Sequence, residues 1–177
     1  VLEIGTGSGY MAALAAHQAA SVLSLEIDSN LAQQARANLQ AAGIANVEVR
    51  NTDGCQGAPA DGPFDVIFLS GSVPEVPQAL LQQLKTGGRL LAVVGEEPVM
   101  RASVITRTGE QQWQTSEPWD TLAPRLQGFP DEYTNIPWRK ADQSPDGPRY
   151  KALGNSWAVP VVHWIGNRIQ KQIKGEK

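Results

Sequence analysis

A glycine cluster near the start of the chain constrains the fold more than any other feature of the sequence. Gly5, Gly7 and Gly9 alternate with Thr6 and Ser8 and follow the apolar run at residues 1–4. Alanine-rich sequence at residues 10–20 comes next, which predicts a strand, a tight turn and a helix. Glycines in such a turn let backbone N–H groups approach a ligand closely. The opening is therefore typical of a nucleotide-binding unit.

Strands and helices continue to alternate through the first half of the chain. We expect strands at residues 22–26, 46–50, 64–69 and 89–94, and helices at residues 28–43 and 77–84. This alternation indicates parallel pairing with right-handed crossovers, hence an α/β fold with a doubly wound, mostly parallel sheet. Residues 101–107 and 111–116 predict a hairpin at its edge. We therefore predict a sheet-forming domain at residues 1–126.

The last third of the chain has a different character. Five prolines punctuate residues 124–148, so we expect an irregular, Pro-rich segment at residues 127–156. A helix is expected at residues 157–174, with Ser156 as its cap. Residues 139–177 hold eight Lys/Arg against three Asp/Glu, although the whole chain has a net charge of −3. This asymmetry fits either a tail that faces nucleic acid or a solvated terminal helix.

Composition limits the remaining classes of protein. No apolar run approaches the roughly 18 residues of a membrane helix, and the chain shows no basic-then-apolar leader. We therefore expect a cytoplasmic protein with no membrane partner. Cys55 is the single cysteine and His17 and His163 the only histidines, so a metal site is not expected. The chain begins at Val1 inside an apolar strand pattern, and we expect an upstream segment to be missing.

Acidic residues near the glycine turn indicate which nucleotide is bound. Glu26 ends the second strand, where a carboxylate can accept hydrogen bonds from both ribose hydroxyls. Dinucleotide oxidoreductases would place Gly or Ala at position 10, and Tyr10 is expected to obstruct close packing between helix and strand there. Glu3 favours S-adenosylmethionine (SAM), because its carboxylate can orient the loop and, through water, the ligand's ammonium group. Asp53 and Gly54 are placed for the adenine amino group, although Asp53 also fits a turn cap.

Several motifs occur in order at family spacing over residues 1–126. They are VLEIGTGSGYMAALAA, LEID, NTDGCQGAPADGPFDVIFLSGS, LKTGGRLLAVVGEEPVM and ITRTG. Together they resemble the protein-L-isoaspartate O-methyltransferase family. The resemblance implies a Rossmann-like class I SAM-dependent methyltransferase fold. It also implies that Gly5, Thr6, Gly7, Gly9, Glu26, Asp53 and Gly54 line the SAM pocket, as Ser8 between the last two glycines would, and that Ser70 lies near the acceptor edge as a candidate catalytic residue.

The chain departs from that family in two ways. Cys55 stands where an aromatic residue is usual. The substrate-binding serine segment of the family lies upstream of the first strand, and the present sequence starts at that strand. We therefore expect a fold without its usual N-terminal segment and an impaired acceptor site.

The C-terminal part resembles a different family. RLQGFPDEYTNIPWR and DGPRYKALGNSWAVPVVHWIGNRI are similar to the last two motifs of DNA cytosine-5 methyltransferases, which suggests a chimera or fusion. That resemblance implies that Asn155 and Ser156 adjoin the SAM site. It also implies that the helix at residues 157–173 packs beside the first strand, on the face that upstream residues would otherwise cover. The Pro-Cys nucleophile of that family is missing, and Cys55 is not expected to replace it.

Three functions follow as hypotheses. The first is a SAM-dependent methyltransferase that acts on a carboxylate of isoaspartyl proteins or peptides. The second is a DNA cytosine-5 methyltransferase fragment, with DNA as its partner. The third is a SAM-binding module without catalysis.

Overall fold

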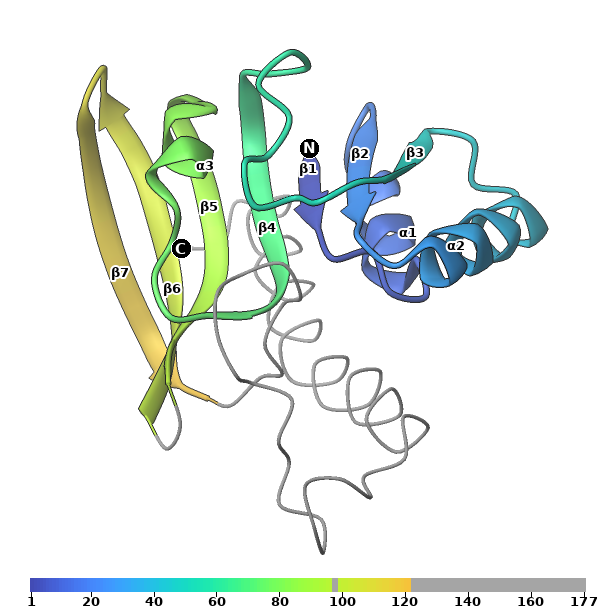
Figure 1. Ribbon diagram of the computed structural model, residues 1–177. Coiled ribbons are helices and arrows are strands. Elements are labelled where there is room, and N and C mark those ends of the chain that lie inside the picture. Colours follow the sequence, from blue (N-terminus) through green and yellow to red (C-terminus); the bar gives the residue numbers. More distant parts are fainter. Residues whose placement is uncertain (97–98, 122–177) are drawn as a thin grey trace, which may run out of the picture. The chain divides into compact units, whose positions relative to one another are not determined.

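The computed structural model describes residues 1–96 and 99–121 (Figure 1). Its elements, in chain order, are β1 (Leu2–Ile4), α1 (Tyr10–Ala16), β2 (Val22–Glu26), α2 (Ser29–Ala41), β3 (Val47–Asn51), β4 (Phe64–Val73), α3 (Gln78–Gln82), β5 (Leu84–Glu96), β6 (Val99–Gly109) and β7 (Gln112–Asp120). The segments predicted at residues 127–156 and 157–174 lie outside the described residues. The packing expected of the last helix against the first strand therefore stays a prediction.

All of the described strands belong to one sheet with the order β3-β2-β1-β4-β5-β6-β7. Strands β1 to β5 pair in parallel, and β6 and β7 continue the sheet as an antiparallel hairpin. This confirms the doubly wound, mostly parallel sheet with an edge hairpin. The strand order reverses at β1, because β2 lies on one side of it and β4 on the other. Ligands of α/β sheets bind beside the carboxyl ends of the strands at such a reversal.

Two crossover helices begin at the predicted residues. The Asp28 side chain caps α2 by accepting hydrogen bonds from the backbone N–H groups of Asn30 and Leu31, at 2.8 and 3.0 Å. Helix α1 ends at Ala16, earlier than predicted. The side-chain amide of Asn46 donates to the carbonyl oxygens of Ala16 and Ala19, at 2.9 and 3.0 Å. Those carbonyls are thereby satisfied without a further helical turn.

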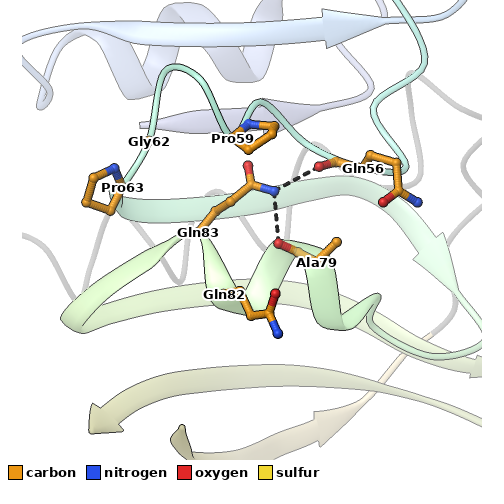
Figure 2. A pocket seen from close by; sticks show the side chains of 7 residues that line it. All are labelled: Gln56, Pro59, Gly62, Pro63, Ala79, Gln82 and Gln83. Atoms are coloured by element: carbon orange, nitrogen blue, oxygen red, sulfur yellow. Dashed lines mark hydrogen bonds between the residues drawn. The ribbon is translucent and has the colours of Figure 1, made fainter. Parts of the chain in front are cut away.

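The connection from β3 to β4, residues 52–63, contains no helix. The Gln83 side chain holds this loop next to α3, as Figure 2 shows. Its Oε1 accepts from the Ala58 N–H at 2.8 Å, and its Nε2 donates to the carbonyls of Gln56 and Ala79 at 2.8 and 2.9 Å. The loop and α3 therefore form one hydrogen-bonded layer.

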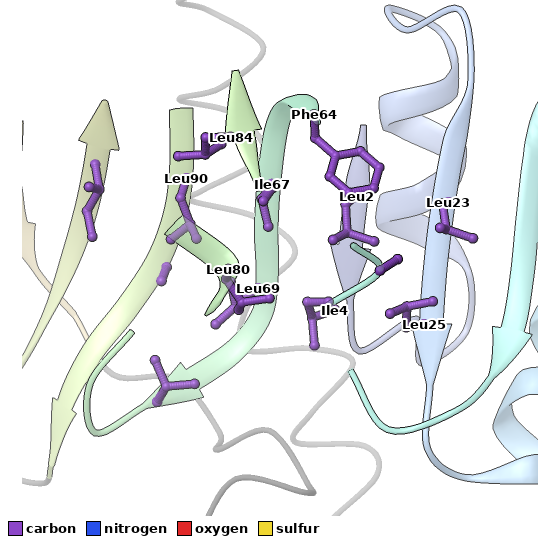
Figure 3. Close-up of a cluster of buried hydrophobic side chains, with 14 residues drawn as sticks. Leu2, Ile4, Leu23, Leu25, Phe64, Ile67, Leu69, Leu80, Leu84 and Leu90 are labelled. Atoms are coloured by element: carbon purple, nitrogen blue, oxygen red, sulfur yellow. The ribbon is translucent and has the colours of Figure 1, made fainter. Parts of the chain in front are cut away.

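The main hydrophobic core lies on the face of the sheet covered by this loop and α3 (Figure 3). Leu2 and Ile4 of β1 are in register with Ile67 and Leu69 of β4, and all four are buried. Successive strand residues point to opposite faces, so Glu3 lies on the other side. On that side α1 and α2 bury smaller apolar clusters against β2 and β3; their buried members are Ala12, Ala16, Val22, Ala32, Ala35, Leu39 and Val49.

Strand β5 begins five residues earlier than predicted, and α3 is correspondingly short. The backbone N–H of Phe64 donates to the Gln83 carbonyl at 2.7 Å, and Phe64 pairs with Leu84. Gly88, expected to end a helix, instead lies inside β5. A Cβ at Gly88 would be 3.0 Å from the carbonyl oxygens of Phe64 and Asp65. Glycine therefore allows β5 to approach β4 here, where the register of the two strands shifts between Phe64 and Val66. Strand β4 also extends beyond the prediction, to Val73.

In the part of the chain that the structure describes, no helix has the length and apolar character that crossing a membrane requires.

Candidate functional site

The glycine turn adopts a backbone that side-chain-bearing residues rarely adopt. Gly5, Gly7 and Gly9 have φ angles of 89°, 54° and 84°, all in the left-handed region. The turn is joined to β2 by a hydrogen bond from the Gly5 N–H to the Leu25 carbonyl at 2.8 Å. A Cβ on Gly7 would find no atom within 4 Å. Open space therefore lies beside the middle of the turn.

Gly9 has a different constraint. A Cβ there would lie 3.3 Å from Leu39 Cγ and 3.4 Å from Ala35 Cβ, so this glycine is where α1 approaches α2. Tyr10, in contrast, is 52% exposed. Our expectation that a bulky ring at position 10 obstructs packing between helix and strand is therefore wrong, because about half of this side chain is exposed to solvent.

Glu26 holds the turn from the end of β2. This carboxylate is buried. Its Oε2 accepts from the Gly7 N–H at 2.8 Å, and its Oε1 accepts from the Asp28 N–H at 3.0 Å. A carboxylate oxygen has two lone pairs, so each oxygen retains one further acceptor position.

Glu3 lies beneath the turn as a fully buried carboxyl group. Ser24 of β2 donates to its Oε2 at 2.6 Å, and Ser70 of β4 donates to its Oε1 at 2.7 Å. The Ser24 hydroxyl also lies 2.5 Å from that of Thr6. Burial raises the pKa of Glu3 to about 7; the two serine hydrogen bonds lower it less, and the negative charge of Glu26 adds to the rise.

Asp53 and Gly54 contribute in unlike ways. Asp53 is exposed, and its Oδ1 accepts from the Cys55 N–H at 2.9 Å, which is the turn-capping geometry considered for it above. A Cβ on Gly54 would lie only 2.7 Å from Ile4 Cγ2, so this glycine is needed for packing against the sheet. Both residues follow the carboxyl end of β3.

The remaining predicted residues are distributed as follows. Thr6 is buried, whereas Ser8 is exposed and its carbonyl accepts from the Asn38 side-chain amide at 2.9 Å. Asn155 and Ser156 lie outside the described residues. The part of the chain described here contains no group of three His, Cys, Asp or Glu side chains that could hold a metal ion.

Sequence reasoning missed two polar residues of the site. Ser24 links Thr6 to Glu3, and the only signal was a hydroxyl residue inside the apolar strand Val22–Glu26. Asn51 ends β3 and its side-chain amide donates to the carbonyls of Glu26 and Ile27 at 2.9 and 3.0 Å. Asn51 therefore fixes the backbone on which the Glu26 side chain stands.

A cavity of about 430 Å³ opens elsewhere, between the loop at residues 52–63 and α3 (Figure 2). It is lined by Gln56, Pro59, Gly62, Pro63, Ala79, Gln82 and Gln83. None of these residues is charged or belongs to the glycine turn, and the amide of Gln83 is occupied by backbone partners. The acidic and glycine residues above therefore form the stronger candidate site.

The strand order, the glycine turn and the carboxylate at the end of β2 define a Rossmann-like class I SAM-dependent methyltransferase fold. The sequence also matches the family described as Protein-L-isoaspartate(D-aspartate) O-methyltransferase (PCMT) over residues 1–121. The chain belongs to this family. The match ends before residues 125–173, so the resemblance of those residues to DNA cytosine-5 methyltransferases stays a prediction.

Individual relatives agree with this assignment. The chain is 53% identical over 95 residues to a protein-L-isoaspartate O-methyltransferase of Methanoculleus marisnigri, covering 54% of this chain and 43% of the relative. A Synechococcus enzyme of the same name is 54% identical over 98 residues, or 55% of this chain and 40% of the relative. The chain thus spans about half the length of the curated relatives it matches.

Solved structures show the same fold. A protein-L-isoaspartate O-methyltransferase superimposes with a TM-score of 0.67 at 31% identity, over 72% of this chain and 42% of that one. A Plasmodium falciparum protein of this description, solved with S-adenosyl-L-homocysteine, gives a TM-score of 0.58 at 22% identity, over 71% and 64% of the two chains. At that identity the second likeness concerns the fold alone.

Proposed function

We propose that this chain binds SAM at the glycine turn and is the cofactor-binding part of a protein-L-isoaspartate O-methyltransferase. The observation that carries the proposal is the Glu26 carboxylate, which is fixed by the Gly7 and Asp28 N–H groups at the carboxyl end of β2, next to the strand β1 at which the strand order reverses. The names of the relatives give the acceptor, a protein or peptide with isoaspartyl residues. A cytoplasmic location is part of the same proposal.

The residues present fit such a cofactor. Glu26 retains acceptor positions for the two ribose hydroxyls, and the space beside Gly7 lets backbone approach a ligand closely. Asp53 is exposed and its carboxylate can accept from the adenine amino group while it caps its own turn. Glu3 is too deeply buried to touch a ligand directly, so its contribution passes through Thr6 and Ser24.

When bound, SAM supplies an activated methyl group. An acceptor carboxylate is already nucleophilic at neutral pH, so no strong general base is required from the protein. The contribution of the chain is to align the acceptor and to exclude water. Burial and the charge of Asp53 raise the pKa of the Cys55 thiol, which disfavours the thiolate that a cytosine-5 mechanism would need.

Calorimetry with S-adenosyl-L-homocysteine tests the binding step. We expect the wild-type chain to bind, and Glu26→Ala to bind about 10- to 100-fold more weakly, because hydrogen bonds to charged groups are worth about 1.5–3 kcal/mol. Glu110→Ala changes a carboxylate in the β6–β7 turn and is the matched control. Circular dichroism establishes that each variant is folded. A folded wild-type chain without affinity for this ligand contradicts the proposal.

Transfer is tested by incubating the chain with radiolabelled SAM and either an isoaspartyl peptide or duplex DNA. Label in the peptide supports the proposed acceptor. Label in DNA would instead support the cytosine-5 hypothesis, which the sequence of residues 125–173 motivates. Binding of the cofactor product without any label in either acceptor would indicate a module that binds and does not transfer.

A further inference from the structure

The glycine turn and strand β4 meet at one buried carboxyl group. Glu3 of β1 lies between Ser24 of β2, its direct cross-strand partner, and β4, which provides Ser70. Thr6 of the turn extends the chain of hydroxyls on the β2 side. Glu3 thus has one oxygen facing the cofactor turn and the other facing Ser70, at the edge where the family resemblance places the acceptor.

The direction of these hydrogen bonds follows from counting protons. A serine hydroxyl has one proton to donate, and that of Ser24 is donated to Glu3 Oε2. The contact between Thr6 and Ser24 therefore has Thr6 as its donor. With Glu3 ionised, Thr6 donates to Ser24, and Ser24 and Ser70 both donate to the carboxylate. Neither the Thr6 proton nor the Ser70 proton is then available to a ligand.

A proton on Glu3 reverses the direction of the hydrogen bonds on one side of its carboxyl group. If the proton is on Oε1, the carboxylic acid donates to Ser70 Oγ, and the Ser70 hydroxyl proton turns to another acceptor. If the proton is on Oε2, the acid donates to Ser24, Ser24 donates to Thr6, and the Thr6 proton is released. In either case a single proton taken from solvent yields one free hydroxyl donor on the turn or on β4.

We propose that Glu3 is a positioning residue that couples the hydroxyl groups of Thr6 and Ser70, so that its protonation frees one of these two hydroxyls to donate a hydrogen bond elsewhere. Ser70 then acts through Glu3 rather than as an independent catalytic group. The identity of the ligand that would accept a hydrogen bond from the freed hydroxyl rests on the proposed function. The coupling itself depends only on the hydrogen bonds described.

The surroundings identify the groups that influence this carboxyl. On β2 the charged neighbour is Glu26, whose negative charge opposes ionisation of Glu3. Strand β4 presents the uncharged Phe68 and Ser70 beside it. Asp53, in the loop after β3, is exposed to solvent. Among the described residues Glu26 is thus the charge that acts on Glu3 from a neighbouring strand.

The test follows the titration of the Glu3 side-chain carboxyl by carbon-13 NMR, assigned by its loss in Glu3→Gln. We expect its midpoint to rise by about one pH unit in Ser70→Ala and also in Ser24→Ala, because each variant removes a donor that stabilises the ionised form. Glu110→Gln should leave the midpoint unchanged. A midpoint in Ser70→Ala equal to that of the wild type overturns the coupling, since a merely structural serine would alter stability without moving this titration.

Affinity for S-adenosyl-L-homocysteine is then measured across the same pH range. The wild-type affinity should change over the pH range in which Glu3 titrates. In Ser70→Ala this change should occur at higher pH. In Glu3→Gln the affinity should no longer depend on pH in this range. An affinity that ignores the Glu3 titration in the wild type also overturns the proposal. If the folded chain binds no ligand at any pH while the Glu3 midpoint moves as expected, the proposed function fails and the coupling between the hydroxyls stands.

Discussion

Gly54 is under a tighter steric constraint than its place in a loop suggests. The chain turns onto the sheet immediately after β3, and a Cβ at this position would lie 2.7 Å from Ile4 Cγ2 and 3.1 Å from Ile4 Cδ1. Ile4 is itself buried at the end of β1, next to the glycine turn. Gly54 therefore sets how closely the loop can approach the strand that supports the candidate site.

We expect Gly54→Ala to lower the free energy of unfolding by about 1–3 kcal/mol, the usual cost of overpacking a core. Urea denaturation measures the change. The matched control is Gly109→Ala, where the nearest atom to a Cβ is the flexible side-chain oxygen of Gln112 at 3.2 Å, and where we expect little loss. Equal stability of the Gly54→Ala variant and the wild type would show that Ile4 can move aside.

At this scale the sequence predicted the residues whose role follows from local pattern. The glycine turn and Glu26 are found by spacing, because both lie at the ends of adjacent strands. Ser24 was missed because its importance comes from Glu3 on a neighbouring strand, and the pairing of Glu3 with Ser24 is not local in sequence. The exposure of Tyr10 was missed because the contact that requires a small residue falls at Gly9.

The loop at residues 52–63 takes the place of a helix between β3 and β4. Its backbone polar groups need partners from elsewhere, and the Gln83 side chain, at the end of α3, gives the loop one donor and one acceptor while its second N–H donates to Ala79 of α3. Gln83 is buried. The packing of the loop at residues 52–63 against α3 and the start of β5 therefore depends on the side-chain amide of Gln83.

Replacement of Gln83 by Ala should lower the free energy of unfolding by about 1–3 kcal/mol, because it leaves the Ala58 N–H and the Gln56 carbonyl without this partner. Gln83→Glu keeps an acceptor for Ala58 and loses the donors, so we expect an intermediate loss. Gln82→Ala is the neighbouring control. Chemical denaturation of the three variants gives the order, and a loss at Gln82 as large as that at Gln83 would contradict this account.

Strands and helices with clear periodicity were predictable, and their junctions were less so. The strands at residues 22–26 and 64–69 were predicted because each is a short, mostly apolar segment between turn residues. The short α3 and the early start of β5 were not predictable, because the Phe64 hydrogen bond to the Gln83 carbonyl joins parts of the chain that have no local signal. The Gly87-Gly88 pair predicts a helix stop, whereas in the structure Gly88 allows β5 to approach β4 and a Cβ on Gly87 would meet no atom within 4 Å.

The interior of the sheet contains a carboxyl group with no exposed surface, that of Glu3 in β1. Burial raises the pKa of Glu3 from 4.5 to about 7, so the folded state binds a proton that the unfolded chain releases between these values. A raised folded-state pKa contributes stability that is fully present below pH 4.5. That stability is lost as the pH rises through 7.

We therefore expect the stability of the wild type, measured relative to Glu3→Gln, to fall by about 3 kcal/mol between pH 4.5 and 8. Carboxylates with lowered pKa values, such as Asp61 and Asp65, are common to both proteins and cancel in the difference. Urea denaturation at a series of pH values measures it. A difference that does not vary with pH would mean that Glu3 is equally protonated in the folded and unfolded states.

Strand β1 comes before every other described strand in the sequence, yet it lies in the interior of the sheet between β2 and β4. Its Leu2, Glu3 and Ile4 find their second set of partners only in Ile67, Phe68 and Leu69. The side of β1 that faces β4 therefore gains its partners in this sheet only after residues 67–69 have been synthesised. An unpaired strand edge can pair with other chains, so we expect a chain that ends before β4 to expose an edge that the complete sheet covers.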